Sequence, residues 1–183
     1  MALGDNNIIG DVTQTLQDLL TGLDVTLDSP ATLPTGGDAD FKKLNLFLYQ
    51  VLENAFAKNQ QWPSTSASQQ EYPPLTINLY YMLTPYAKDT LSAHQVLSHA
   101  MGLLHDHSLV SGGDLAGELP VVVEQLAIVL CPTTLEDLTR IWNALQSPYR
   151  LSVCYEVRIA LIQSEIRRDV SRVSTKTDVF QQI

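Results

Sequence analysis

The architecture of this chain follows from one apolar segment, Leu44-Asn45-Leu46-Phe47-Leu48-Tyr49-Gln50-Val51-Leu52. Successive side chains of a strand point to opposite faces, and here both faces carry large apolar residues. A strand with this pattern is typical of a sheet that is covered on both sides. We therefore predict a central strand at residues 44–52.

Three further segments predict strands. Residues 75–84 alternate apolar and more polar side chains, which predicts a half-buried strand that ends at Pro85. Residues 119–130 predict another strand, closed by Cys131-Pro132. Residues 150–163 alternate as well, and at about 3.3 Å per residue they would span about 46 Å, more than twice the usual strand. This last strand either bends or projects past the domain.

Three segments have the periodicity of amphipathic helices. The first runs from Ile8 to Leu23, with Asp5 placed to cap it, and turns into a short strand at residues 23–27. The second covers about twenty residues after Pro85. The third begins at a capping box of Thr133 and Glu136. Its expected buried side is Leu135, Leu138, Ile141, Trp142 and Leu145.

The order of these elements predicts an α+β fold in a single domain, with a mostly antiparallel or mixed β-sheet and packed helices. We expect this domain at residues 1–163. Residues 164–183 are expected to form a C-terminal arm or a docked helix, because Ile166, Val170 and Val173 recur at helical spacing.

Charge is scarce and unevenly distributed along the chain. Charged residues make up 17% of the 183 residues, against about 25% in an average domain. The formal charge of −9 is the wrong sign for a phosphate-binding surface, so we expect no nucleic-acid partner. Residues 1–41 contain seven Asp and no Lys or Arg, whereas seven of the eleven basic residues lie between Arg140 and Lys176. Such segregation suits subunits that meet through unlike faces; a neutral surface rich in Ser, Thr and Gln is the alternative explanation of the low charge.

The sequence also predicts where the chain is found. Its first residues have neither the basic start nor the apolar run of a secretory signal, so we expect synthesis and retention in the cytoplasm. Polar residues interrupt the longest apolar runs, which predicts no membrane insertion. Cys131 and Cys154 lack a metal-binding spacing and are expected to be buried thiols.

The four histidines raise the question of a metal site. On a helix that turns about 100° per residue, His94 and His99 lie about 140° apart and cannot share an ion. Only His105-Asp106-His107, if extended, would present two ligands on one side. Phosphate-cradle, dinucleotide, zinc-protease and nucleophile-elbow motifs are missing. We therefore predict no catalytic residues, no metal site, no cofactor and no enzyme activity.

Four residues are candidates for protein contacts. Trp62 is the one large apolar side chain in the polar segment 57–73, and a loop tryptophan can anchor a partner. The alternative is that it folds back on its own domain. Arg167, Arg168 and Arg172 are the other candidates, against the alternative of a solvated face on a short helix.

Several segments together, in their order and spacing, resemble the tail-terminator or cap proteins of extracellular contractile injection systems, such as the antifeeding prophage. These segments are Leu46–Val51 with Glu53-Asn54, Pro74-Leu75, Leu79–Tyr86, His94–Met101, Leu104–Asp106, Leu135–Leu138, Ile141-Trp142, Tyr149–Val153 and Tyr155.

The resemblance implies a hexameric ring that sits on the distal end of the inner tube and sheath and ends their polymerisation. It implies a structural protein within a phage-tail-like, virion-like assembly, which is either released or membrane-anchored. Sheath and inner-tube proteins are the implied partners, and no enzyme activity is implied. Two alternatives stay open: a baseplate or adaptor subunit of the same machinery, and a small cytosolic metal-dependent hydrolase built on His105-Asp106-His107.

Overall fold

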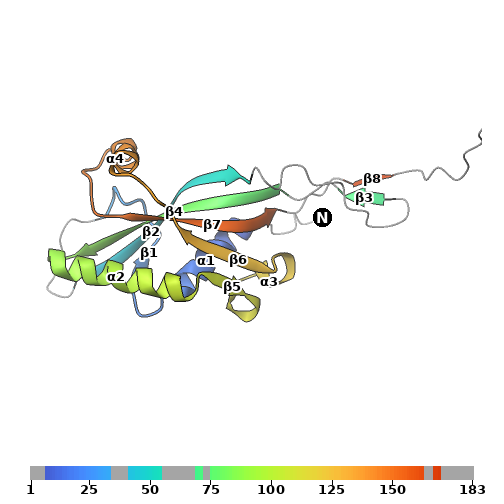
Figure 1. The fold of residues 1–183 in the computed structure, drawn as a ribbon, viewed down its shortest axis with the longest axis horizontal. Coiled ribbons are helices and arrows are strands. Elements are labelled where there is room, and N and C mark those ends of the chain that lie inside the picture. Colours follow the sequence, from blue (N-terminus) through green and yellow to red (C-terminus); the bar gives the residue numbers. More distant parts are fainter. Residues whose placement is uncertain (1–6, 34–40, 55–68, 72–74, 163–166, 170–183) are drawn as a thin grey trace, which may run out of the picture.

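The computed structural model describes residues 7–33, 41–54, 69–71, 75–162 and 167–169 (Figure 1). Its elements in chain order are α1 (Ile8–Leu19), β1 (Val25–Thr26), β2 (Lys42–Glu53), β3 (Gln69–Glu71), β4 (Leu75–Ala87), α2 (Thr90–Asp106), β5 (Leu109–Ser111), the 3₁₀ helix η1 (Gly112–Asp114), α3 (Leu119–Val122), β6 (Gln125–Leu130), α4 (Leu135–Ala144), β7 (Val153–Ile162) and β8 (Arg167–Asp169).

Six of these strands form one mixed sheet in the order β1-β2-β4-β7-β6-β5. β1 is parallel to β2, and the other neighbours are antiparallel. Helices lie on both sides of the sheet, with α2 below and α4 above in Figure 1. The predicted α+β class with a mixed sheet and packed helices is confirmed.

β4 is one of the two central strands of this sheet. It pairs with β2 on one side and with β7 on the other. β2 was predicted to be central, and this is wrong, because its outer neighbour β1 pairs only with Leu44 and Asn45. Burial follows the pairing: Leu44 to Leu46 are buried, whereas Val51 and Leu52 are exposed.

β4 is buried on both faces rather than half-buried as predicted. Tyr81, Met82 and Leu83 are all fully enclosed. The strand also continues through Pro85, which was predicted to end it. Leu44 directs its backbone N–H toward β1, where it donates to Asp24, so its partner Pro85 needs no N–H on the β2 side. Beyond Leu83, β4 has no registered partner in β7 among the described residues, so a proline is tolerated there.

The two faces of the sheet carry cores of different size. The larger one lies under α1, α2 and α3. The smaller one lies under α4. It consists of Met82, Leu138, Trp142 and Cys154, with Phe47, Tyr49, Cys131, Ile141 and Leu145 at its margin. α4 therefore covers only part of its face of the sheet.

α4 begins one residue later than predicted. The capping box joins Thr134 to Asp137, not Thr133 to Glu136. Thr133 remains in the link after β6, where its N–H donates to the Cys131 carbonyl. Leu135 was expected to be buried but is 65% exposed, at the first position of α4.

Two other expectations are corrected. The opening helix is confirmed, but Asn7 is its N-cap residue, and Asp5 lies outside the described residues. The expected strand 119–130 is divided into α3 and β6, since Pro120 suits the first turn of a helix.

The last strand of the large sheet is shorter than predicted: β7 begins at Val153 and has ten residues. Its predicted alternation is confirmed, with Tyr155 and Val157 in the larger core.

β8 pairs with β3 in a separate two-stranded sheet. Its three residues are extended and do not follow the helical spacing noted above. The proposed division into residues 1–163 and a C-terminal arm or docked helix stays a prediction. Within the described segments, no helix combines the length and apolarity needed to cross a membrane.

The attachment of α4 can be tested at Trp142, whose buried Nε1 donates to Ser152 Oγ over 3.0 Å. We expect Trp142→Phe to lower the free energy of unfolding by about 1–3 kcal/mol, because the buried Ser152 hydroxyl loses this donor. Denaturant unfolding measures the change. Leu135→Ala, at an exposed site on the same helix, is the control and should change stability by less than about 0.5 kcal/mol. Equal losses for both variants would contradict this account of the anchor.

Candidate functional site

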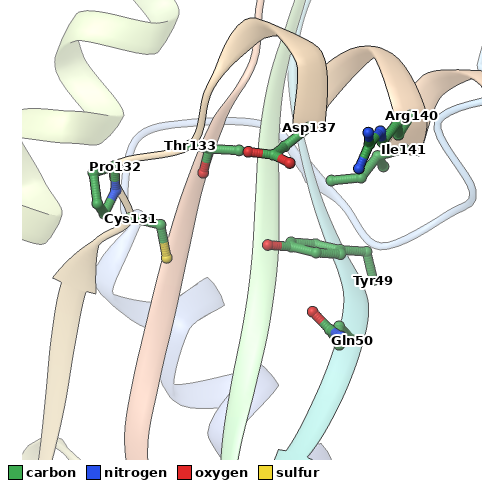
Figure 2. A pocket seen from close by; sticks show the side chains of 8 residues that line it. All are labelled: Tyr49, Gln50, Cys131, Pro132, Thr133, Asp137, Arg140 and Ile141. Carbon is green, nitrogen blue, oxygen red and sulfur yellow. The ribbon is translucent and has the colours of Figure 1, made fainter.

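A hollow of about 530 Å³ opens beside α4, on the face of the sheet that this helix covers incompletely. It lies between β2, the end of β6 and the first turns of α4 (Figure 2). The residues that line it are Tyr49, Gln50, Cys131, Pro132, Thr133, Asp137, Arg140 and Ile141.

Local structure positions the side chains around this hollow. The β2–β4 register shifts between Leu48 and Gln50, so Tyr49 occupies a bulge. Its ring lies below α4, with the hydroxyl directed toward the side of Cys131 and Asp137 (Figure 2). A tilted contact with the Tyr80 ring, at 6.3 Å between centroids, supports it from the neighbouring strand. The capping box holds Asp137 at the opposite wall.

A polar network continues from Tyr80 across the uncovered part of the same face. Glu156 Oε1 accepts hydrogen bonds from Asn78 Nδ2 over 2.8 Å and from the Tyr80 hydroxyl over 2.9 Å. Arg158 donates from two nitrogens to Glu156 Oε2, at 2.9 and 2.7 Å. The Arg158 side chain is half exposed, whereas that of Glu156 is largely enclosed. This surface therefore presents one guanidinium on a rigid polar base.

The ionisable side chains of the hollow and of the Glu156 network keep their ordinary charge states at neutral pH. Burial raises the pKa of the Cys131 thiol to about 11, helped by the nearby Cys154 and Glu156. Burial also raises the pKa of the Tyr49 hydroxyl. Burial opposes ionisation of Glu156, but its hydrogen bonds from Arg158 and Tyr80 outweigh this and lower its pKa. The thiol and phenol therefore stay protonated at neutral pH, and the carboxylate stays charged.

The histidine cluster does not form a ligand pair. His105 and Asp106 are in the last turn of α2, so the extended arrangement considered for residues 105–107 is wrong. The His107 ring lies with Nδ1 2.9 Å from the Leu103 carbonyl oxygen. No group of three potential metal ligands occurs in the part of the chain that the structure describes.

The structure does not describe the side chains of the four contact residues predicted from the sequence. Trp62 and Arg172 lie outside the described residues. Arg167 and Arg168 belong to β8, where only the backbone is described. Their roles stay predictions.

Sequence analysis did not identify the residues that the structure brings together here. The alternation of residues 150–163 placed Glu156 and Arg158 on one face, but nothing local indicated that α4 would leave this face uncovered. The bulge at Tyr49 depends on pairing with β4 and has no signal in a single strand.

The pKa of Glu156 generates a pH-dependent prediction. Because folding lowers this pKa below its ordinary value of 4.5, the ionised group adds stability above that pH, and the contribution is lost as pH falls through the lowered value. We expect Glu156→Gln to destabilise the fold most at neutral pH, and the difference from wild type to shrink below pH 4.5. Denaturant unfolding at several pH values measures it. Glu136→Gln, which removes an exposed partner of Arg140, is the control; a pH-independent Glu156 difference would contradict the linkage.

Known proteins share this fold. Residues 7–176 match the model of the Pvc16 N-terminal domain. The sheath/tube terminator of the extracellular contractile injection system PVC, in its extended state, is similar over 96% of this chain with a TM-score of 0.67 and 18% identity. The tube-terminating cap of the anti-feeding prophage is similar over 95% of this chain, with a TM-score of 0.61 and 16% identity.

This chain spans 64% and 60% of the length of those two proteins. Among curated proteins, none matches the sequence. At these identities the two structures establish a shared fold, and the resemblance to cap proteins noted from the sequence is confirmed. Since the family model covers nearly the whole sequence, the chain belongs to the Pvc16 N-terminal domain family.

Proposed function

We propose that this protein is a structural tail terminator of a phage-tail-like contractile injection system, in which a hexameric ring caps the distal end of the inner tube and sheath. The observation that carries the proposal is the fold, which is shared with two solved terminators along at least 95% of this chain. The particle that contains it is assembled in the cytoplasm and then released or anchored at a membrane.

The physics of termination explains what such a subunit needs. A head-to-tail polymer exposes the same acceptor surface after each added layer, so growth continues until a molecule occupies that surface without offering a new one. A closed ring of copies does this by shape. Each subunit then needs surfaces for its two neighbours and others for the tube and the sheath.

The sheet supports such contacts at its edge. From Leu46 to Leu52, no strand among the described residues pairs with the outer side of β2. An open edge accepts an extended segment by β-augmentation. A C-terminal arm at residues 164–183 that adds to a neighbour's sheet would use this chemistry, with Arg167, Arg168, Arg172 and the Trp62 segment as contact elements.

We also propose that the protein is not an enzyme. Within the described residues, the ionisable side chains around the hollow form stable hydrogen bonds or stay protonated, which does not activate a nucleophile.

This proposal predicts that the Cys131 thiol is alkylated slowly. Its pKa is raised from 9.0 to about 11. At neutral pH, this higher pKa lowers the fraction of thiolate about 100-fold. We therefore expect iodoacetamide to label Cys131 about 100-fold more slowly than an unfolded peptide that spans it. Peptide mapping by mass spectrometry separates it from Cys154. Labelling as fast as in the peptide would contradict the raised pKa, and labelling faster than in the peptide would reveal an activated thiol and favour an enzymatic role.

Deletion of the gene in the producing cell tests the capping function directly. We expect tubes and sheaths of uncontrolled length, or unstable particles, because nothing occupies the last layer. Electron micrographs of purified particles measure the length distribution, and re-expression of the chain should restore it. Particles of normal length in the deletion strain would refute the proposal, and localisation of the chain at the baseplate end would favour the adaptor alternative.

A further inference from the structure

A second hollow, of about 250 Å³, lies at the start of α2. It is formed where the end of β4 meets the segment that leads from α4 into β7. The residues that line it are Pro85, Ala87, Lys88, Asp89, Thr90, Ala93, His94, Arg150 and Leu151. Its wall is partly apolar, and Leu151 is 45% exposed.

The charge on the rim of this hollow is positive. Lys88 is exposed. The Arg150 guanidinium lies 5.0 Å from the centroid of the Tyr86 ring, which orients it. The one carboxylate, Asp89, already accepts bonds from the Ser92 N–H and hydroxyl, at 2.9 and 2.7 Å. Two cations are therefore available to an anionic partner in a protein of net charge −9.

A complementary surface surrounds α3. Val121 is 87% exposed, the most exposed of the large apolar side chains described. Asp114, Glu118 and Glu124 are exposed on either side of it in sequence. From Asp89 to Thr139 the sequence contains no Lys or Arg, so this segment does not neutralise its own acids. We call Asp114, Glu118, Val121 and Glu124 the α3 tip.

The α3 tip is held in place by α1. Thr15 Oγ1 accepts the Ala116 N–H over 2.9 Å, and Asp11 Oδ2 accepts the Glu118 N–H over 3.1 Å. Gly117 between them has φ of +58°, and a Cβ there would clash with the Asp11 carboxyl group. The tip is thus fixed before any partner binds, which lowers the entropic cost of association.

The two surfaces are at different ends of the molecule. The hollow is at the N-terminal end of α2, and α3 lies beyond the opposite end (Figure 1). The 17 residues of α2 span about 25 Å at about 1.5 Å per residue. The α3 tip cannot fill the hollow of its own chain, whereas unlike patches at opposite ends allow a head-to-tail contact between copies.

We infer that the α3 tip of one copy docks into the α2 hollow of the next, with Val121 against the apolar wall and Glu118 and Glu124 facing Lys88 and Arg150. The occupant of the hollow is a second copy of this chain, because the tip supplies both the apolar side chain and the charge that the hollow lacks. This inference rests on the proposed ring and identifies the contact that closes it.

Charge reversal tests the contact with the purified full-length chain. The double variants Lys88→Glu/Arg150→Glu and Glu118→Lys/Glu124→Lys each place like charges across every contact, so each alone should be monomeric by native mass measurement. In the mixture, the hollow of the first variant can bind the reversed tip of the second, and the unchanged tip of the first can bind the unchanged hollow of the second. The mixture should therefore form oligomers with equal numbers of the two variants. Glu136→Lys on α4 is the control and should assemble like wild type, and unchanged melting temperatures show that all variants fold.

The outcomes separate the contact from the capping function. Normal self-association of either variant, a mixture that stays monomeric, or a wild-type chain that stays monomeric at its highest soluble concentration would each overturn the inference. The same variants expressed in the deletion strain should lose length control singly and regain it together. If deletion impairs particles but either variant alone caps them normally, the capping function stands and this contact is wrong.

Discussion

The burial of β4 on both faces is the constraint on which the rest of the structure depends. Tyr81 and Leu83 face one helical layer and Met82 faces the other, so the strand needs helices above and below it. Each large side chain that is fully buried contributes about 1.5–3 kcal/mol. β2 and β7 satisfy its backbone on either side. The hollows described above therefore lie at the ends and partly covered areas of the sheet.

The unequal covering of the two faces explains where polar surface remains. Three helices cover the larger core, whereas α4 is the only described helix on the other side. The space that α4 leaves is occupied by Tyr49, Tyr80 and the Glu156–Arg158 pair, which are linked by hydrogen bonds or ring contact. These groups stabilise each other in their resting charge states, so the carboxylate and the guanidinium of this surface are already paired with each other. A surface of this kind suits the proposed terminator, which would work by shape.

The distribution of charge over the molecule also bears on how copies associate. Copies that each carry −9 repel one another, so association needs local attraction and correct orientation. Unlike patches at the two ends of α2 provide both, since like-charged alternatives are disfavoured. Head-to-tail contacts of this type close into rings when the rotation between copies allows it. The proposed ring, and with it the proposed role at the end of a tube, thus depends on the opposite charges of these two patches of the subunit.

Local patterns in the sequence determined the types of the longer elements, because helical and strand periodicities express themselves over a few neighbouring residues. They predicted α1, α2, α4 and the alternation of β7, and they indicated that Trp142 is buried. Tertiary structure decided the strand order, which made β4 central instead of β2. It also selected Thr134 over Thr133 as the cap of α4, since both have an acidic residue three positions later. The bulge at Tyr49, the gap beside α4 and the meeting of α1 with α3 depend on contacts between distant segments, and periodicity along one segment carries no information about which face its neighbours will cover.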